Sequence, residues 1–159
     1  MEDLTPFNIF TSILMQKKPS ATAWINGNAD YPSLSGRAGF YDTPLGGVIV
    51  NIEVYGLPDT VNTSDFFGMH IHEFGNCTPP FDKTGNHYNP TNAEHPNHAG
   101  DMPPLLSNNG YAWTAFYDKC FTISEIIGKS IVIHLMRDNF TSQPSGDSGM
   151  KIGCGVIMR

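Results

Sequence analysis

Short runs of apolar residues with a period of two dominate the chain from Ala21 onward. In the run VIVNIEV, the side chains of Val48, Val50, Ile52 and Val54 fall on one face, because successive side chains of a strand point to opposite sides. Turn residues separate this run from similar ones, which read ATAWI, GYAWTAFYDKCFTI, KSIVIHLM and KIGCGVIM. This pattern predicts an all-β fold of six to eight short strands, in an antiparallel sandwich or barrel.

Composition narrows the class of protein. The chain has 159 residues, of which 40% are hydrophobic and 15% charged, as expected for one globular domain with a real core. Its formal net charge is −6 with only 9 Lys and Arg residues, which argues against a nucleic-acid partner. No apolar run reaches about 18 residues, so no membrane-spanning helix is expected.

The first 20 residues differ from the rest. Acidic Glu2 and Asp3 precede their apolar core, and Lys17 and Lys18 follow it, which is the reverse of a secretory signal. We expect residues 1–20 to form a short helical or irregular extension that packs on a domain of residues 21–159. A cytoplasmic location is expected, with export and surface association left open.

Residues 75–109 are rich in Pro, Asn and Gly and have little periodicity. A loop this long inside a compact domain needs a function or something that pins it. It contains His87, His95, His98 and Asp101. Each histidine taken singly is more often a solvated loop residue. Together, three imidazoles and one carboxylate satisfy a tetrahedral zinc site, which would pin the loop.

Three further histidines fall on expected strands. His70 and His72, in GMHIHEF, stand two residues apart and share a face. His134 ends the apolar run SIVIH and alone would be interpreted as a core residue. Beside the first two it supplies a third imidazole. Imidazole-rich sites suit copper or zinc, and all six histidines of the chain belong to these two sets.

The runs GMHIHEFGNC, GNHYNP, HPNHAGD, IVIH and GCGVI together resemble the copper–zinc superoxide dismutase family, over roughly residues 21–157. The resemblance implies an eight-stranded Greek-key β-barrel, grouped with immunoglobulin-like sandwiches, with long metal-binding and electrostatic loops. It also implies the metal ligands. Copper would be held by His70, His72, His87 and His134, and zinc by His87, His95, His98 and Asp101, so that His87 bridges the two metals. Asp138 would link His70 to His95 and fix both rings.

The three cysteines alone allow one disulfide and one free thiol, and they contain no CxxC pair of the kind that binds zinc. The resemblance implies a disulfide between Cys77 and Cys154. Closing about 78 residues would stabilise the fold by roughly 4 kcal/mol in the chain-entropy model. The alternative is two reduced thiols. Cys120 is interpreted as a small buried residue on a strand.

The resemblance further implies that copper cycles between two oxidation states while superoxide is converted to dioxygen and hydrogen peroxide. His87 would supply a proton. Lys151 stands where the family has an arginine beside copper, and lysine keeps the charge without the planar fork. The alternative for Lys151 is a solvated surface charge. The electrostatic loop has Arg137 as its only cation, so that steering of the anion is expected to be weak.

Two alternatives to the enzyme use the same barrel. One is a non-enzymatic relative that binds zinc or holds copper, and the other is a structural β-domain stabilised by metals. A relative without activity would be expected to lack a copper ligand, and none is missing here. The expected partner is superoxide, with no nucleic acid and no membrane, and a homodimer is possible.

Overall fold

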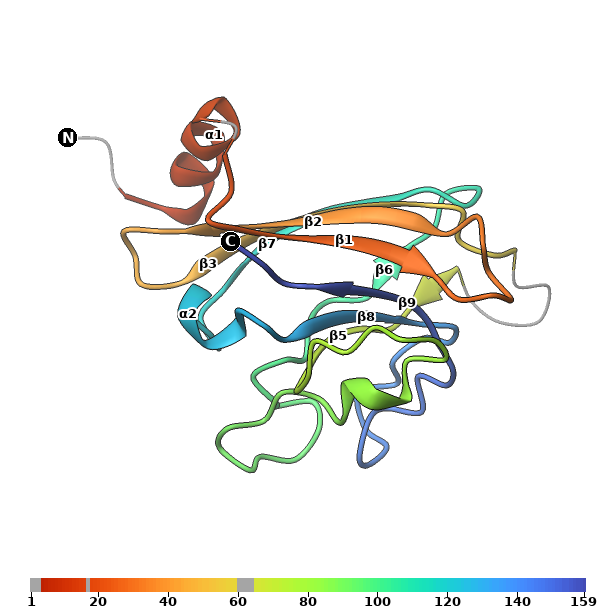
Figure 1. Ribbon diagram of the computed structural model, residues 1–159. Coiled ribbons are helices and arrows are strands. Elements are labelled where there is room, and N and C mark those ends of the chain that lie inside the picture. The colour runs from red at the N-terminus through yellow and green to blue at the C-terminus, as the bar shows by residue number, and fades with distance from the viewer. Residues whose placement is uncertain (1–3, 17, 60–64) are drawn as a thin grey trace.

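The computed structural model describes residues 4–16, 18–59 and 65–159 (Figure 1). Most of the regular structure is β-strand. The elements, in chain order, are α1 (Pro6–Gln16), β1 (Ala21–Gly27), β2 (Ser35–Asp42), β3 (Val48–Tyr55), β4 (Phe66–Phe67), β5 (Met69–His72), the 3-10 turn η1 (Asp82–Thr84), β6 (Leu105–Leu106), β7 (Ala112–Asp118), α2 (Ile123–Ile126), β8 (Ser130–His134) and β9 (Lys151–Val156).

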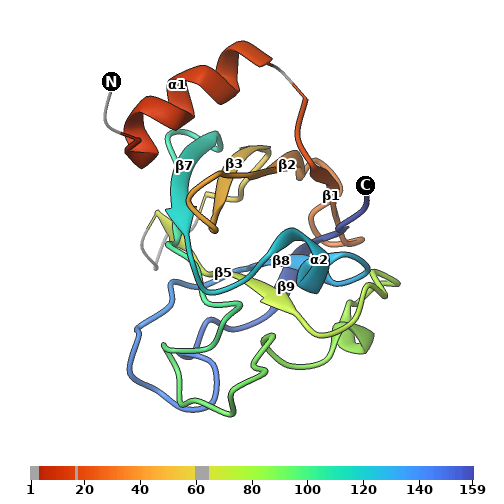
Figure 2. The same ribbon diagram turned by 90° about the vertical axis from the view of Figure 1, so that its left-hand side faces the viewer.

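Seven strands form one antiparallel sheet in the order β5-β8-β9-β1-β2-β3-β7, and β4 pairs with β6 in a separate ladder. The large sheet curls, so that β1, β2, β3 and β7 lie across the core from β5, β8 and β9 (Figure 2). After β3 the chain crosses to β5 on the far side, and β7 returns to pair with β3, which is a Greek-key connection. The all-β prediction is confirmed.

The core lies between the two halves of the curled sheet. Val48, Val50, Ile52 and Val54 of β3 are fully buried and belong to it, which confirms the period of two seen in the sequence. Each buried side chain of this size contributes about 1.5–3 kcal/mol relative to an exposed one. The same alternation on β5 and β8 directs apolar side chains into the core and places the remaining side chains on the opposite face.

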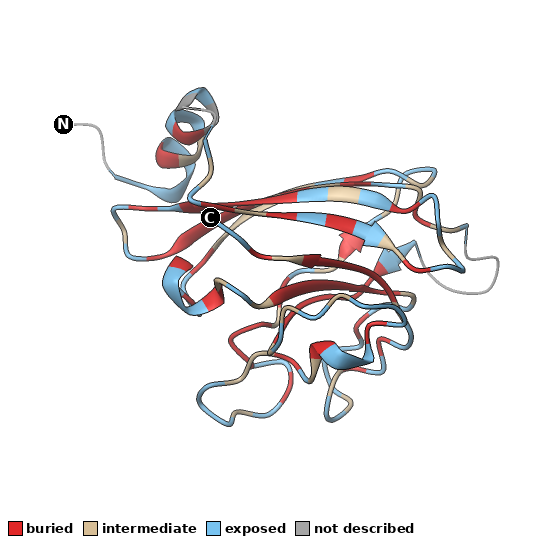
Figure 3. Ribbon diagram, in the orientation of Figure 1, coloured by how far each residue is buried: buried red, intermediate tan, exposed pale blue. Residues whose placement is uncertain are grey.

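Strands β5 and β8 are buried on both faces (Figure 3). Their inward side chains, which include Ile71 and Ile133, join the core. Their outward side chains include all three strand histidines. Two long loops, residues 73–104 and 135–150, lie on that side of the molecule (Figure 1). The loops therefore bury polar side chains that would otherwise face solvent.

Helix α1 packs on the opposite, outer face of the sheet. Its Ile9 and Ile13 contact Tyr41 and Ile49, which lie on β2 and β3. This contact explains why Ile49 is 2% exposed although it points away from the core. The N-terminal segment is thus helical where it is described, and it packs on the sheet as expected.

The predicted strand GYAWTAFYDKCFTI ends sooner than its pattern suggests. The side chain of Asp118 accepts a hydrogen bond from the backbone N–H of Cys120 at 2.7 Å, which turns the chain at the end of β7. Cys120 is consequently exposed, and its prediction as a buried strand residue was wrong. Residues after it form α2, which begins with a capping box between Thr122 and Glu125.

Candidate metal centre

Three imidazoles from two neighbouring strands meet outside the core. His70 and His72 share the outer face of β5 because they are two residues apart. His134 ends β8, and its backbone N–H donates to the carbonyl of Gly68, just before β5, at 2.8 Å. The Nε2 atoms of His72 and His134 lie 3.2 Å apart.

The long loop lies along the edge of β5. The N–H of Ile71 donates to the carbonyl of Gly100, and the carbonyl of Ile71 accepts from the N–H of Tyr88, both at 2.8 Å. These bonds set up two antiparallel bridges, His72 with His87 and His70 with Asp101. Residues opposite one another in paired chains share a face. The loop side chains therefore lie beside the imidazoles of β5.

Two groups of four potential ligands result. We call the first the four-imidazole group and the second the Asp101 group. Within each group, one ligand atom from every residue lies within 4.8 Å of the others. The four-imidazole group is His70, His72, His87 and His134, and the Asp101 group is His87, His95, His98 and Asp101. His87 belongs to both.

The Asp101 group is built around one carboxylate. Nδ1 of His87 lies 2.7 Å from Oδ1 of Asp101, and Nδ1 of His95 and His98 lie 3.0 and 3.2 Å from Oδ2. The Nδ1 atoms of His87 and His98 are themselves 3.4 Å apart. Three ring nitrogens and a carboxylate thus converge on one small volume, which is the donor set that zinc prefers.

Three buried ring nitrogens in these groups have no hydrogen-bond partner among the described residues: Nδ1 of His70, Nε2 of His87 and Nδ1 of His95. Nδ1 of His95 lies close to Asp101, but the contact does not have the geometry of a hydrogen bond. A buried polar atom without a partner costs about 1–3 kcal/mol. Each of the three atoms belongs to a residue of a four-ligand group, and a metal ion would satisfy it. The donor sets present therefore fit two metal ions, and nitrogen-rich coordination fits copper and zinc.

Asp138 ties the two groups together. Its Oδ2 lies 2.8 Å from Nε2 of His70, and its Oδ1 lies 2.8 Å from Nε2 of His95. Both rings then carry their proton on Nε2, which leaves Nδ1 free as a ligand. Burial alone would raise the pKa of Asp138, but the hydrogen bonds from His70, His95 and the backbone of Phe140 outweigh it and lower that pKa to about 2.

The strand histidines are held neutral. Burial lowers the pKa of His72 well below its usual range. Burial, with repulsion from His70, lowers the pKa of His134 to about 3. A neutral imidazole offers a lone pair, and metal binding needs one. His72 and His134 are therefore in their ligand form at neutral pH.

Comparison with known proteins agrees with this geometry. The family model described as Copper/zinc superoxide dismutase (SODC) matches residues 34–157, which is most of the chain. The chain belongs to the copper/zinc superoxide dismutase family. It is 33% identical over 140 residues to superoxide dismutase [Cu-Zn] 2 of Aquifex aeolicus, with 77% of this chain and 78% of that protein covered.

Other dismutases match over less of their length. The chain is 31% identical over 153 residues to the extracellular superoxide dismutase [Cu-Zn] of Mus musculus, which covers 88% of this chain but 58% of the mouse protein. Among solved structures, a double mutant of a superoxide dismutase-like protein from Bacillus subtilis superposes with a TM-score of 0.76 at 26% identity, covering 87% of this chain and 97% of that one. The clock protein EA4 superposes with a TM-score of 0.75 at 27% identity, covering 89% and 96%.

The disulfide that the dismutase resemblance implied is confirmed between Cys77 and Cys154, whose Cα atoms are 5.6 Å apart. It joins the start of the metal loop to β9, over a sequence separation of 77. Several matched dismutases are named extracellular, and the expected cytoplasmic location gains no support from them. Among the described helices, none has the length and hydropathy needed to cross a membrane.

Lys151, which the family resemblance aligns with an arginine beside copper, begins β9 and is half-buried. Its Nζ donates to Oγ1 of Thr84 at 2.9 Å and to the carbonyl of Gly85 at 3.1 Å. The same carbonyl lies 2.9 Å from Nδ1 of His72. Burial lowers the pKa of Lys151, and Asp82 opposes that shift. The ammonium is therefore anchored one carbonyl away from the four-imidazole group.

Two residues that position members of the ligand groups could not be predicted from the sequence. Gln143 accepts a hydrogen bond from the N–H of His95 at 3.0 Å and donates to its carbonyl at 2.7 Å, so that it clamps the backbone of a loop histidine. Gly146 has a positive φ of 70°, and a Cβ there would lie 2.0 Å from Oδ1 of Asp138. Glycine is thus required at the Asp138 bridge. Only the turn-rich composition of residues 139–149 hints at either role.

Proposed function

We propose that this chain dismutates superoxide, converting two superoxide anions and two protons into dioxygen and hydrogen peroxide. When bound, copper in the four-imidazole group supplies the one-electron redox chemistry, and zinc in the Asp101 group supplies a fixed positive charge. The proposed copper ligands are His70, His72, His87 and His134, and the proposed zinc ligands are His87, His95, His98 and Asp101. The observation that carries the proposal is the position of His87 in both groups.

The two nitrogens of His87 have different surroundings. Nδ1 lies 2.7 Å from Asp101, in the second group. Nε2 is buried, has no partner among the described residues, and belongs to the side of the four-imidazole group. We assign Nε2 of His87 as the atom that holds a proton and passes it to the reduced substrate. Asp101, on the other nitrogen, keeps the ring in one orientation while the proton moves.

Lys151 is the proposed anion-binding residue. An ammonium has three N–H donors. Two of them are used by Thr84 and Gly85, which leaves one for a small anion. Because lysine lacks the planar fork of arginine, it holds an anion through fewer donors. Arg137 is exposed, and among the described residues of loop 135–150 it is the one cation that can add to the steering.

Asp138 is the proposed positioning residue, since it holds one ring of each group in the tautomer that leaves Nδ1 free. We also propose that residues 21–159 form the catalytic domain and residues 1–20 an extension to it. The disulfide and the extracellular relatives favour an oxidising compartment for this chain. A homodimer is the proposed assembly, to be tested by sedimentation.

The test compares superoxide dismutation by protein loaded with zinc alone and with zinc plus one equivalent of copper. Activity is expected only with copper, and the variant His134→Ala, checked for folding by circular dichroism, should lose it. Lys151→Arg is expected to raise the rate a few fold, while Lys119→Arg, at an exposed site, should not change it. An inactive protein with a full copper absorption band would contradict the proposal and leave a non-enzymatic metal binder.

A further inference from the structure

The outer face of the sheet that is opposite the metal loops divides into two ends. At one end, α1 covers Tyr41, Ile49 and Tyr117. At the other end, no described helix or strand lies over the sheet (Figure 1). Four aromatic side chains at this end are in solvent. Their exposed fractions are 67% for Trp24, 51% for Tyr55, 37% for Tyr111 and 57% for Trp113. We call this end the open aromatic face.

Strand register places four of its side chains in one row. Trp24 of β1 pairs with Arg37 of β2, Arg37 pairs with Glu53 of β3, and Glu53 pairs with Trp113 of β7. Three spacings between strands make the row about 14 Å long. Two tryptophans thus stand at the ends of a row with a cation and an anion between them. Because the strands are held by the core, the row is preformed.

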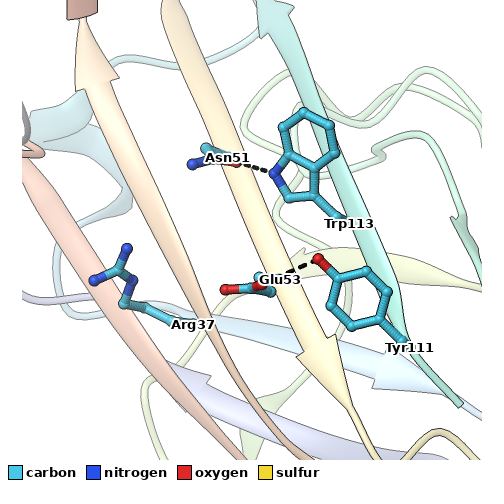
Figure 4. Close-up of a pocket in the computed structure, with 5 residues that line it drawn as sticks. All are labelled: Arg37, Asn51, Glu53, Tyr111 and Trp113. Carbon is cyan, nitrogen blue, oxygen red and sulfur yellow. Dashed lines mark hydrogen bonds between the residues drawn. The ribbon is translucent and has the colours of Figure 1, made fainter. Parts of the chain in front are cut away.

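Glu53 in the row, and Asn51 beside it, accept hydrogen bonds from aromatic neighbours, and Figure 4 shows those from Tyr111 and Trp113. Tyr55 and Tyr111 both donate to Oε1 of Glu53, at 2.8 and 3.0 Å. The indole N–H of Trp113 donates to Oδ1 of Asn51 at 2.8 Å. Three of the four aromatic donors are therefore used within the face, and their main effect is to orient Glu53 and Asn51.

The hydrogen-bonding groups that the face leaves unused include both donors and acceptors. Among the described residues, Oε2 of Glu53 accepts no hydrogen bond, and no carboxylate oxygen lies within 4.0 Å of the Arg37 guanidinium. The amide NH2 of Asn51 is also without a described acceptor. A ligand would meet an acceptor at Glu53 and donors at Arg37 and Asn51. Two hollows of about 190 and 390 Å³ share Arg37 and Glu53.

We propose that the open aromatic face binds an oligosaccharide. A sugar ring carries hydroxyls, each of which both donates and accepts, so that it matches Glu53 and Arg37 together. Its C–H groups suit the negative face of an aromatic ring such as Trp113. The Arg37 guanidinium lies over one face of the Trp24 ring, 5.9 Å from its centroid, which leaves the other face of Trp24 for a sugar. Pockets that enclose a drug-sized ligand measure about 300–1,000 Å³, and two adjoining shallow hollows fit successive rings of a chain better than one buried molecule.

A proline-rich peptide is the nearest competitor, because such peptides dock on aromatic grooves. That mode needs donors for the peptide carbonyls. The tyrosine hydroxyls and the indole N–H of Trp113 are already bonded within the face. Among its described residues, only Arg37, Asn51 and the indole N–H of Trp24 are left to donate. A prolyl carbonyl also offers nothing to the free oxygen of Glu53. The mixed set of unused groups therefore favours a polyol.

Tryptophan fluorescence reports on this face directly, since Trp24 and Trp113 are the only two tryptophans of the chain. The holoprotein is titrated with cellohexaose, chitohexaose, laminarihexaose and mannohexaose, and with decaproline as the peptide probe. A saturable change is expected with at least one hexasaccharide and none with decaproline. Trp113→Ala and Glu53→Gln should each weaken that binding at least tenfold, with dismutation unchanged.

Phe7→Ala is the matched control, because Phe7 is an exposed aromatic on α1. It should bind like the unaltered protein. The proposal is overturned if no hexasaccharide gives a saturable response, or if Trp113→Ala and Glu53→Gln bind as well as the unaltered protein. It is equally overturned by a response to decaproline alone, or by a dimer in sedimentation that Trp113→Ala converts to monomer, since the face would then join two copies. None of these outcomes depends on copper loading, so they are separate from the dismutation test.

Discussion

The two ligand groups share His87 but are built in different ways. In the four-imidazole group, His70, His72 and His134 stand on β5 and β8, whose other face is the apolar core. In the Asp101 group, every member comes from the long loop, and hydrogen bonds take the place of a core. Strand pleat positions the first group before any metal binds, whereas the second depends on a network of polar contacts.

The difference predicts unequal stability. Segments with few apolar contacts open at low free energy, while core strands open only with the whole protein. A metal that binds only the folded loop adds its binding free energy to the loop. We therefore expect the Asp101 group to be the first part of the centre to lose order when its supports are removed.

Removal of the disulfide should have the largest effect. In metal-free protein, replacing Cys77 and Cys154 by Ser is expected to lower the free energy of unfolding by about 4 kcal/mol, since the bond closes a long loop. Urea unfolding measures the loss, and Cys120→Ser, at an exposed site, is the control. Zinc affinity should fall more than copper affinity. An equal fall would show that the two groups are not independently built.

Acid should act first on the strand-held group. The pKa of His134 is about 3 in the fold and 6.5 in the unfolded chain, so its contribution is full above pH 6.5 and is lost as the pH falls toward 3. Asp138, with a pKa of about 2 against 3.8, adds a loss only below about pH 4. Each group changes the unfolding free energy by at most about 1.4 kcal/mol per pH unit.

This pH dependence is measured on metal-free protein by urea unfolding between pH 7.5 and 4. His134→Gln should remove part of the slope in that range, because the substituted amide does not titrate, while His70 and His72 still contribute to the slope. A slope that is unchanged in His134→Gln would contradict the assignment and leave the slope to His70 and His72.

Loss of the Asp138 bridge should disturb both groups at once. In Asp138→Ala, Nε2 of His70 and of His95 lose their common acceptor, and metal affinity is expected to fall about 10–100-fold. Titration against a chelator measures each metal separately. The loop-held zinc should be affected more than copper, and the reverse order would mean that β5 does not fix the ring of His70.

The smallest effect should come from Gln143→Ala, which removes both hydrogen bonds to the backbone of His95. Zinc affinity is expected to fall by about 1 kcal/mol, or roughly fivefold, and copper affinity to stay the same. Ser142→Ala is the control for loop substitutions, because it removes a hydrogen bond from Asn139 in the same loop that does not reach His95. A matching loss of copper would show that the loop also positions the strand ligands.

The strands could be predicted because their pattern is local. The alternation at Val48, Val50, Ile52 and Val54 follows from strand pleat alone, and the core confirms it. The end of β7 could not be read in this way, since one side-chain hydrogen bond from the backbone of Cys120 to Asp118 ends an otherwise continuous pattern. Local polar contacts override propensity at such points.

The candidate site likewise contains some residues that could be predicted from the sequence and others that could not. The histidines and Asp101 could be named from their residue types and spacing, and the structure brings their ligand atoms together. Gln143 and Gly146 could not, because their roles depend on where loop 135–150 lies relative to His95 and Asp138. The row from Trp24 to Trp113 could not be predicted from the sequence either, because it joins four strands whose register no single segment specifies.

The bonds between Ile71 and the long loop have a consequence for self-association. Strand β5 is one end of the seven-stranded sheet, and an uncovered strand of this kind is a template for pairing with other chains. Here Gly100 and Tyr88 occupy the backbone groups of Ile71. The loop that carries the proposed zinc ligands thus also covers the edge of the sheet and opposes aggregation. Zinc-free protein should form β-rich assemblies sooner than zinc-loaded protein, beginning at the segment Met69–His72.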